Sequence, residues 1–439
     1  MTETTHGRHR SGARTQGGQR WQVGPPRPAR LHRHDPRTAL AVDAGRLAAA
    51  LSRRLGAGSG GMIGGRLALA LQPRALQRLA VGRRIVMITG TNGKTTTTQM
   101  VAEALRSQAP AVSNATGANM LDGHVAALMT GLDAPFAALE VDELHLAQVT
   151  ERIEPAVAVL LNLSRDQLDR VGEIRTVEAS LRRALAQAPR TRVVANRDDP
   201  NVVSAAFDHP HVTWVSGGAR WKDDAVNCPR CGACLGDGDL PWTCACGLFR
   251  PEADWTVTAE GLRGPDGALH PVTLALPGHV NRINAAFALA AALELGCDGE
   301  AALERIERVS QASGRYSTVR LDGHPVRLLL AKNPASWLEM LDLVSAHDRP
   351  LVLSVNSREA DGYDVSWLWD VDFESLRGRT VAVTGDRALD LAVRLRYAGV
   401  RCEVAGSVEA AVSASDGEIP DVIANYTAFR DLFARSVRP

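Results

Sequence analysis

The chain has 439 residues, of which 45% are hydrophobic and 23% are charged, as in ordinary globular proteins. This length allows two or three domains, each with a core of its own. The formal net charge of +1 argues against a dedicated nucleic-acid-binding protein, because such proteins carry a strong basic excess. Arginine supplies almost all of the positive charge, and the only lysines are Lys94, Lys222 and Lys332.

The N-terminus lacks the apolar stretch of a signal peptide, and no apolar run reaches the length of a membrane-spanning helix. We therefore expect a cytoplasmic protein, with a peripheral position at the inner face of the membrane as a further option. Residues 1–37 are rich in Arg, His, Gly and Pro without periodicity, which predicts a disordered basic tail. Two alternatives for this tail are an arm that binds nucleic acid or anionic membrane and a start codon assigned too early.

In chain order, the first predicted elements are a helix over 38–55, a glycine-rich loop over 56–69 and a short helix over 73–79. After these, continuous apolar strands alternate with helices, which predicts a parallel sheet covered on both faces. The predicted strands are 85–88, 136–142, 156–163, 192–199 and 212–217, and the predicted helices are 96–105, 177–187 and 283–296.

Past Gly314 the α/β pattern starts again and predicts a second domain of about 120 residues. Its predicted strands are 325–332, 351–356, 380–385, 402–406 and 421–426, and its predicted helices are 336–345 and 388–399. The expected organisation is thus a tail (1–37), an ATP-binding α/β domain (38–313) with a cysteine-rich insert (217–255), and a Rossmann-like C-terminal α/β domain (314–439).

The stretch IVMITGTNGKTTTTQM, residues 85–100, joins a buried strand to a helix through a glycine turn. Gly90 and Gly93 let backbone N–H groups face a bound polyphosphate, and the N-terminus of the helix adds a partial positive charge. Lys94 supplies a point charge to the outer phosphates, and a threonine hydroxyl that follows it can bind Mg²⁺. The spacing Gly-x-x-Gly-Lys-Thr is two residues shorter than the common Walker A loop. It predicts an ATP site rather than a plain strand–turn–helix junction.

The shortened loop resembles that of the Mur ligase superfamily, the ATP-dependent amide-forming enzymes that include the peptidoglycan-building ligases and folylpolyglutamate synthase. Four further segments agree in order: LEVDE (139–143), LNLSRDQLDR (161–170), LPGHVNRINAAFALAAA (276–292) and SGRYSTV (313–319). The resemblance implies that a glutamate of the first segment holds Mg²⁺ and that a Gly-Arg pair of the last contacts nucleotide. The implied nucleotide and Mg²⁺ site comprises Gly90, Thr91, Asn92, Gly93, Lys94, Thr95, Thr96, Glu140, Asn281, Asn284 and Arg315.

A second Mg²⁺ site is in question, because two of its usual ligands in the superfamily are absent. Gln167 stands where the family has a metal-binding histidine. No lysine that could be carbamylated occurs between Lys94 and Lys222. Asp166 and Asp169 either replace these missing Mg²⁺ ligands or are only solvent-exposed residues of a loop. The first Mg²⁺ site, formed by a threonine of the phosphate loop and a glutamate, is not affected.

Five of the seven cysteines fall in one segment, CPRCGACLGDGDLPWTCACG, residues 228–247. Paired thiolates beside glycine turns are typical of tetrahedral zinc sites, and a closed site of four thiolates is structural. We expect Cys228, Cys231, Cys244 and Cys246 to bind structural Zn²⁺, with Cys234 as the alternative ligand and an iron–sulfur cluster as the alternative metal group.

AKNPASW (331–337) and ADGYDVSWLWDVDFE (360–374) resemble one branch of the superfamily, the MurT-type ligase subunits of lipid II isoglutaminyl synthase. The resemblance spans about residues 40–435, and in that branch the partner is a glutaminase of the GatD type. It implies ATP-dependent activation of the α-carboxylate of D-glutamate in the lipid II stem peptide as an acyl phosphate. Ammonia from the glutaminase then forms D-isoglutamine, a step of peptidoglycan synthesis.

The cysteines independently favour an external source of ammonia, because a glutaminase needs an activated cysteine beside a histidine. The resemblance makes Asp361 and Asp364 candidates for orienting the catalytic histidine of the partner, and either residue alone can instead cap a turn. Lys332 is expected at the cleft between the domains, in contact with phosphate or the acyl phosphate, or on the surface. Trp367 and Trp369 are either partner anchors or core residues.

Two other functions stay open. A stand-alone ligase would join an amino acid to a murein or folate carboxylate, and it would have to account for the zinc ribbon and for residues 360–374. A non-catalytic ATP-binding scaffold for cell-wall enzymes would agree with the loss of the usual histidine at Gln167. The retention of Lys94, Thr95 and Glu140 opposes that reading.

Overall fold

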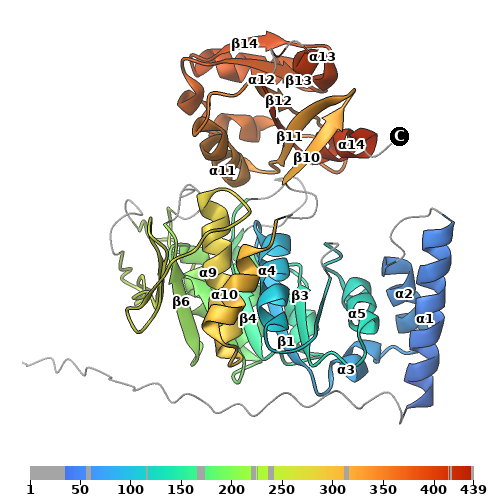
Figure 1. The fold of residues 1–439 in the computed structure, drawn as a ribbon. Coiled ribbons are helices and arrows are strands. Elements are labelled where there is room, and N and C mark those ends of the chain that lie inside the picture. The colour runs from blue at the N-terminus through green and yellow to red at the C-terminus, as the bar shows by residue number, and fades with distance from the viewer. Residues whose placement is uncertain are drawn as a thin grey trace, which may run out of the picture.

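The structure is a computed structural model that describes residues 35–55, 61–114, 117–165, 174–218, 224, 226–235, 242–310, 316–413, 415 and 418–436. These residues form two sheets, one of nine strands and one of six, each with helices on both faces (Figure 1). Among the described residues, none of the helices is both long enough and apolar enough to span a membrane.

The nine-stranded sheet has the order β2-β3-β1-β4-β5-β6-β7-β8-β9. Neighbouring strands are parallel as far as β7, and β7, β8 and β9 pair antiparallel. The strand bounds are β1 Arg84–Thr89, β2 Ala111–Ser113, β3 Phe136–Glu140, β4 Val157–Leu160, β5 Arg192–Asn196, β6 Val212–Ser216, β7 Trp255–Val257, β8 Leu262–Arg263 and β9 Leu269–His270. The predicted parallel sheet is thus present, with an antiparallel edge that the sequence reading did not include.

Two helical layers cover this sheet. Alternate residues of β1 enter opposite cores: Val86 and Ile88 pack in the core with α4, α9 and α10, and Ile85 and Met87 pack in the core with α3 and α5. Burial on both faces is the reason why the strands read as continuous apolar runs. The helix bounds are α1 Pro36–Arg54, α2 Gly61–Leu71, α3 Ala75–Ala80, α4 Lys94–Arg106, α5 Leu121–Thr130, α6 Leu146–Thr150, α7 Ile174–Ala186, α8 Pro200–Ala206, α9 His279–Glu294 and α10 Gly299–Glu307.

The expectation of a glycine-rich loop over 56–69 is wrong from Gly61 onward, where helix α2 begins, and residues 56–60 lie outside the described residues. Gly64 and Gly65 of this helix serve close packing instead of breaking the chain. A Cβ at Gly45 of α1 would lie 2.7 Å from the Gly64 carbonyl oxygen, and a Cβ at Gly65 would lie 1.9 Å from the Asp122 carbonyl oxygen. Residues without a side chain therefore let α1, α2 and α5 approach one another.

The six-stranded sheet belongs to the C-terminal part of the chain and has the order β10-β11-β15-β12-β13-β14. All neighbouring strands are parallel except β10 and β11, which form an antiparallel hairpin. Strand β10 is half exposed and was not predicted. The strand bounds are β10 Tyr316–Leu321, β11 His324–Leu330, β12 Leu351–Ser354, β13 Thr380–Thr384, β14 Arg401–Val404 and β15 Asp421–Ala424.

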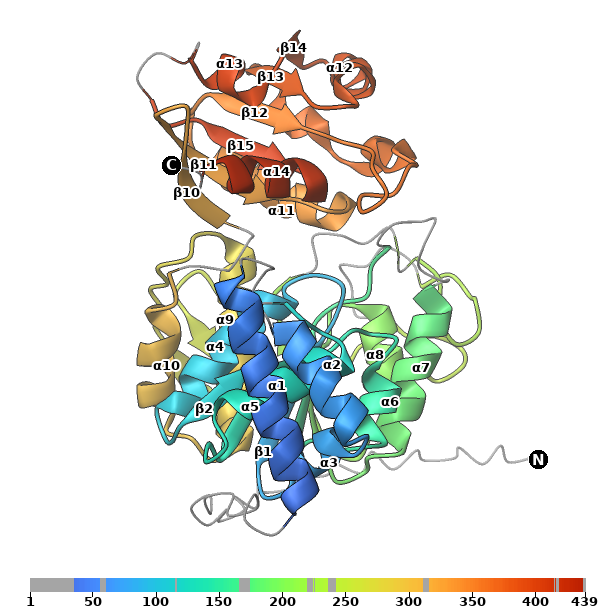
Figure 2. The same cartoon turned by 90° about the vertical axis from the view of Figure 1, so that its right-hand side faces the viewer.

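Helices again lie on both faces of the second sheet (Figure 2). One core joins α11 and α12 to two short 3₁₀ helices, and the other joins α13 and α14. The bounds are α11 Pro334–Ser345, η3 Ser366–Asp370, η4 Phe373–Leu376, α12 Ala388–Tyr397, α13 Val408–Ser413 and α14 Tyr426–Ser436. The observed order of parallel strands agrees with the expected Rossmann-like α/β unit.

Candidate functional site

The glycine turn after β1 has the geometry of a phosphate-binding loop. Gly90 and Gly93 adopt φ values of 141° and 83°, which favour glycine. The space around them is also closed to a side chain, because a Cβ at Gly90 would lie 2.9 Å from Leu161 Cβ and one at Gly93 2.9 Å from Asn284 Oδ1. Helix α4 begins at Lys94, directly after the turn, so its positive N-terminal end faces the loop.

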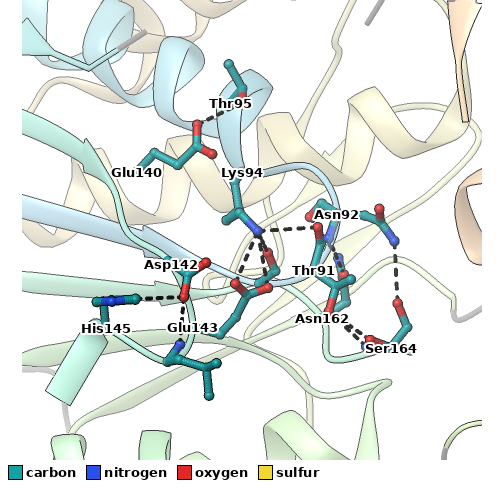
Figure 3. Close-up of polar contacts among 12 residues, drawn as sticks. Thr91, Asn92, Lys94, Thr95, Glu140, Asp142, Glu143, His145, Asn162 and Ser164 are labelled. Atoms are coloured by element: carbon teal, nitrogen blue, oxygen red, sulfur yellow. Dashed lines mark hydrogen bonds and ion pairs between the residues drawn. The ribbon is translucent and has the colours of Figure 1, made fainter. Parts of the chain in front are cut away.

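The loop is clamped by the end of strand β4. The backbone N–H of Asn92 donates to Asn162 Oδ1 over 2.8 Å, and Asn162 Nδ2 donates back to the Asn92 carbonyl over 3.1 Å (Figure 3). The N–H of Thr91 donates to the Asn162 carbonyl over 2.8 Å. These bonds fix the loop before any ligand arrives, which lowers the ordering cost of binding.

Lys94 lies inside this site and is paired with an acidic side chain. Its Nζ donates to the Gly90 carbonyl over 2.6 Å and to the two carboxylate oxygens of Glu143 over 3.1 and 3.3 Å (Figure 3). Burial raises the pKa of Glu143, and the charge of Lys94 opposes that rise. We did not single out Glu143 from the sequence, although it is the last residue of the quoted segment LEVDE. The carboxylate of Glu143 thus accepts hydrogen bonds from the Lys94 ammonium group, which a bound phosphate would need as its own donor.

Thr95 and Glu140 come together as expected for a Mg²⁺ site. Thr95 Oγ1 donates to Glu140 Oε2 over 2.8 Å (Figure 3). Two side chains fix the backbone of Glu140. Asn114 Oδ1 accepts from the Glu140 N–H over 2.7 Å, and Asn114 Nδ2 donates to the Glu140 carbonyl over 2.8 Å. His124 Nε2 lies 2.8 Å from the same carbonyl oxygen. A hydroxyl and a carboxylate, both buried, fit a hard cation that prefers oxygen ligands. Asn114 and His124 were not foreseen as supports of this pair.

Helix α9 contributes the two predicted asparagines. Asn284 is buried beside Gly93, and its Nδ2 donates to Asn281 Oδ1 over 3.4 Å. Asn281 Nδ2 in turn donates to the Pro277 carbonyl over 2.6 Å. This arrangement puts the start of α9 against the phosphate loop. Other residues of the sequence-based proposal, namely Asp166, Gln167, Asp169 and Arg315, lie outside the described residues.

The C-terminal part of the chain reaches the same loop. Asn92 Nδ2 donates to Asn333 Oδ1 over 3.2 Å, and Asn333 is also the N-cap of helix α11. The preceding residue, Lys332, holds its Nζ 5.5 Å from the centre of the Tyr426 ring. Lys332 is therefore next in the chain to Asn333, which makes a direct contact between the domain of the six-stranded sheet and the domain of the nine-stranded sheet.

The cysteine cluster is the second candidate site. Cys228, Cys231, Cys244 and Cys246 place their sulfur atoms within 4.8 Å of one another, and Cys234 is not in this group. The sulfurs of Cys228 and Cys246 lie 3.6 Å apart, and those of Cys231 and Cys244 lie 3.3 Å apart. A tetrahedral site with Zn–S bonds of about 2.3 Å has sulfurs about 3.8 Å apart, so the four thiols fit Zn²⁺.

The two candidate aspartates of the C-terminal domain have different surroundings. Asp361 accepts from the N–H of Thr427 over 2.8 Å and from its hydroxyl, so it fastens the start of α14. Asp364 is exposed and accepts from the N–H of Ser366 over 2.8 Å. That backbone bond, together with the Ser366 hydroxyl, lowers the pKa of Asp364. Asp364 is thus an ionised carboxylate at the surface.

The tryptophans near these aspartates also differ. Trp367 packs against the fully buried Trp337, with 6.0 Å between ring centres. Trp369 is 54% exposed and contacts Tyr397 edge to face over 5.4 Å, and Tyr397 is 75% exposed. With Leu389 and Val393 of α12, these two rings form an exposed apolar surface, here called the η3–α12 patch.

Comparison with known proteins agrees with this geometry. The family model for the Mur ligase middle domain matches residues 88–230, and the model for the MurT ligase C-terminal domain matches residues 330–429. Among solved structures, a pseudomurein peptide ligase type C from Methanothermus fervidus gives a TM-score of 0.63 at 19% identity, over 83% of this chain and 80% of that one. MurF from Acinetobacter baumannii gives a TM-score of 0.62 at 18% identity, over 84% of this chain and 80% of that one. The two family models make this chain similar to the Mur ligase family in both of its α/β domains.

Within that family, the similarity over most of the chain is to the MurT subunit of lipid II isoglutaminyl synthase (glutamine-hydrolysing). The subunit from Streptococcus pneumoniae is 29% identical over 91% of this chain and 97% of its own length. The subunit from Staphylococcus aureus strain N315 is 28% identical over 83% of this chain and 89% of its own length.

Proposed function

We propose that this chain is the ATP-dependent synthetase subunit of a lipid II isoglutaminyl synthase. It would convert the α-carboxylate of D-glutamate in the lipid II stem peptide to the amide, with ammonia supplied by a separate glutaminase of the GatD type. The observation that carries the proposal is the preformed phosphate loop with Lys94 at its centre, in a chain whose similarity to MurT subunits runs through both domains.

The phosphate loop supplies the activation of the acid. A carboxylate is a poor electrophile, so its oxygen first attacks the γ-phosphorus of ATP, ADP leaves, and an acyl phosphate forms. Backbone N–H groups of the loop and the ammonium group of Lys94 would balance the charge that develops on the phosphoryl oxygens. Thr95 and Glu140 would hold Mg²⁺, which when bound offsets the same charge. Lys94 would exchange Glu143 for phosphate when nucleotide binds, so we assign Glu143 the role of a placeholder for phosphate.

Ammonia then attacks the acyl carbon, phosphate leaves, and the nitrogen loses a proton to give the amide. The cysteines support an external source of this ammonia. Four of the seven form the cluster that we propose to bind structural Zn²⁺. Burial raises the pKa of Cys297 to about 11 and also raises that of Cys402, so neither is an activated thiolate. Cys234 is exposed in the insert beside the cluster.

The C-terminal domain offers a surface for the glutaminase. The η3–α12 patch is apolar, exposed and rich in aromatic rings, which is the composition of interface anchors. Asp364 precedes η3 by two residues. Its ionised carboxylate can accept a hydrogen bond from an imidazole and so fix the tautomer of that imidazole. Asp361 is less suited, because Thr427 already occupies its carboxylate. We therefore assign the orienting role to Asp364 and a fastening role to Asp361, and we keep Lys332 as a candidate contact for phosphate.

The experiment is an amidation assay with the purified chain, ATP and a lipid II analogue. Ammonium salt should give amidated product, and glutamine should give none until the glutaminase is added. Product that requires an added amino acid would establish the stand-alone ligase instead. ATP that is bound but never consumed would establish the scaffold.

A further inference from the structure

Helix α1 has two apolar faces, and only one of them is used by the fold. Ala41, Val42 and Gly45 are buried against the rest of the domain. Leu40, Leu47, Leu51 and Leu55 are between 56% and 73% exposed. Their spacing of seven and four residues puts these four leucines on one side of the helix.

Helix α2 continues this surface. A Cβ at Gly45 would lie 2.7 Å from the Gly64 carbonyl, so the two helices touch, and they lie side by side on the face turned to the viewer in Figure 2. Met62, Ile63, Leu67 and Leu71 of α2 are between 36% and 49% exposed. The four leucines of α1 and these four side chains are together called the hairpin face. Contiguous apolar surface of this kind marks a docking site.

The charges around the hairpin face identify what docks there. Within their bounds, α1 and α2 contain five arginines and one acidic residue, Asp43, whereas the whole chain carries a net charge of +1. Residues 1–35, which precede α1, contain seven arginines and two acidic residues, Glu3 and Asp35. Basic residues close to an anionic lipid surface are attracted to it. The same charges oppose pairing of the hairpin face with a second copy of itself.

We propose that the hairpin face docks the protein on the surface of an anionic membrane, with α1 and α2 lying in the plane of the interface. A leucine stripe bordered by arginines is the composition of an interfacial helix pair, and a basic segment supplies the second signal that stable docking requires. The docking rests on the hairpin face and on the basic residues around it, and not on the proposed function. Its use in the reaction rests on the proposed function, in which the substrate is lipid-linked.

The test is co-sedimentation of the purified full chain with lipid vesicles, without nucleotide. Vesicles of phosphatidylcholine with about one-third phosphatidylglycerol should bind the chain, and pure phosphatidylcholine vesicles should bind it far less. The variant L47E/L51E should lower the partition coefficient about tenfold or more, because two leucines can no longer enter the interface. Leu389→Glu is the matched control, since Leu389 is 72% exposed on α12, and it should bind like the wild type.

Several outcomes would overturn the proposal. Wild-type protein that does not sediment with anionic vesicles would do so, as would L47E/L51E protein that binds like the wild type. A wild-type dimer that L47E/L51E converts to a monomer, without vesicle binding, would assign the face to a second copy. Melting temperatures of the variants check folding, and the milder L47S/L51S pair replaces L47E/L51E if that variant does not fold.

Amidation of a soluble, lipid-free stem peptide separates the two proposals. L47E/L51E should keep the wild-type rate on that substrate. Vesicle binding by a chain that makes no amide at all would refute the proposed function and leave the docking intact.

Discussion

The phosphate loop and the segment that carries Asp364 are both candidate functional regions, but they differ in how complete they are. At the phosphate loop, two central side chains already have partners in the same chain: Lys94 has Glu143, and Thr95 has Glu140. At the C-terminal segment, Asp364 and Trp369 are exposed. The difference agrees with our proposal that the first region binds its ligands within this chain, whereas the second faces a partner subunit.

The largest effect should come from the loop itself. Lys94→Ala should reduce amidation with ammonium about a thousandfold, because a positioned charge on the transferred phosphoryl group is lost. Lys222→Ala, in the cysteine-rich insert, is the matched control and should leave the rate unchanged. Amide formation at the wild-type rate by Lys94→Ala protein would remove the loop from the reaction.

Asp364→Asn should affect amidation differently with the two sources of ammonia, glutamine and ammonium salt. With the glutaminase present, glutamine-dependent amidation should fall about a hundredfold, because the amide cannot stabilise an imidazolium. Amidation with ammonium salt should not change. Equal loss with both nitrogen sources would place Asp364 in the synthetase site instead.

Asp361→Asn is the companion of that variant and should behave differently. It weakens the bonds to Thr427 at the start of α14, so it should cost about 1 kcal/mol of stability, as loss of a helix cap does. Calorimetry of the purified chain measures this effect. A glutamine-specific loss of activity with unchanged stability would reverse our assignment of the two aspartates.

Removal of one cluster thiolate should affect stability rather than chemistry. Cys246→Ser should abolish zinc binding and lower the melting temperature by about 8 °C, because metal binding is part of the folding free energy of such an insert. Cys234→Ser should retain the metal, since Cys234 is not in the cluster. Metal analysis by mass spectrometry distinguishes the two. A metal-free wild type of equal stability would contradict the zinc assignment.

The last variant, Glu143→Gln, removes the counter-charge of Lys94 and should change ligand-induced stabilisation rather than the reaction itself. The Lys94 ammonium group would keep the Gly90 carbonyl but lose its counter-charge, at a cost of roughly 2 kcal/mol in the nucleotide-free protein. Mg-ATP should then raise the melting temperature of the variant more than that of the wild type, because phosphate replaces the lost carboxylate. Glu151→Gln, at an exposed glutamate, is the control. Equal shifts for all three proteins would refute the placeholder role of Glu143.

The two regions also differ in how well the sequence predicts them. The phosphate loop depends on fixed spacing along one strand–turn–helix unit, so its residues are predictable from local sequence. Glu143 was missed because its pairing with Lys94 depends on where strand β3 ends relative to β1. The choice between Asp361 and Asp364 depended on Thr427, more than sixty residues away in the chain.

Errors in the fold prediction have similar causes. The glycines of α2 predict a loop, although Gly64 and Gly65 allow a close approach to neighbouring helices that only the folded structure reveals. Strand β10 was missed because its side chains are mostly half exposed and give no apolar run. By contrast, β1, β3, β4, β5, β6 and the parallel strands of the second sheet were predicted within a few residues of their observed bounds, whereas the three-residue parallel strands β2 and β7 were not predicted.

The most direct test follows the oxygen atoms of the substrate carboxylate. A lipid II analogue with heavy oxygen in the α-carboxylate of its D-glutamate is incubated with the purified chain, ATP and ammonium salt. If the chain makes an acyl phosphate, each phosphate released with amidated product carries one heavy oxygen, and Lys94→Ala releases almost none. Amidated product accompanied by unlabelled phosphate would contradict activation of the acid at this loop.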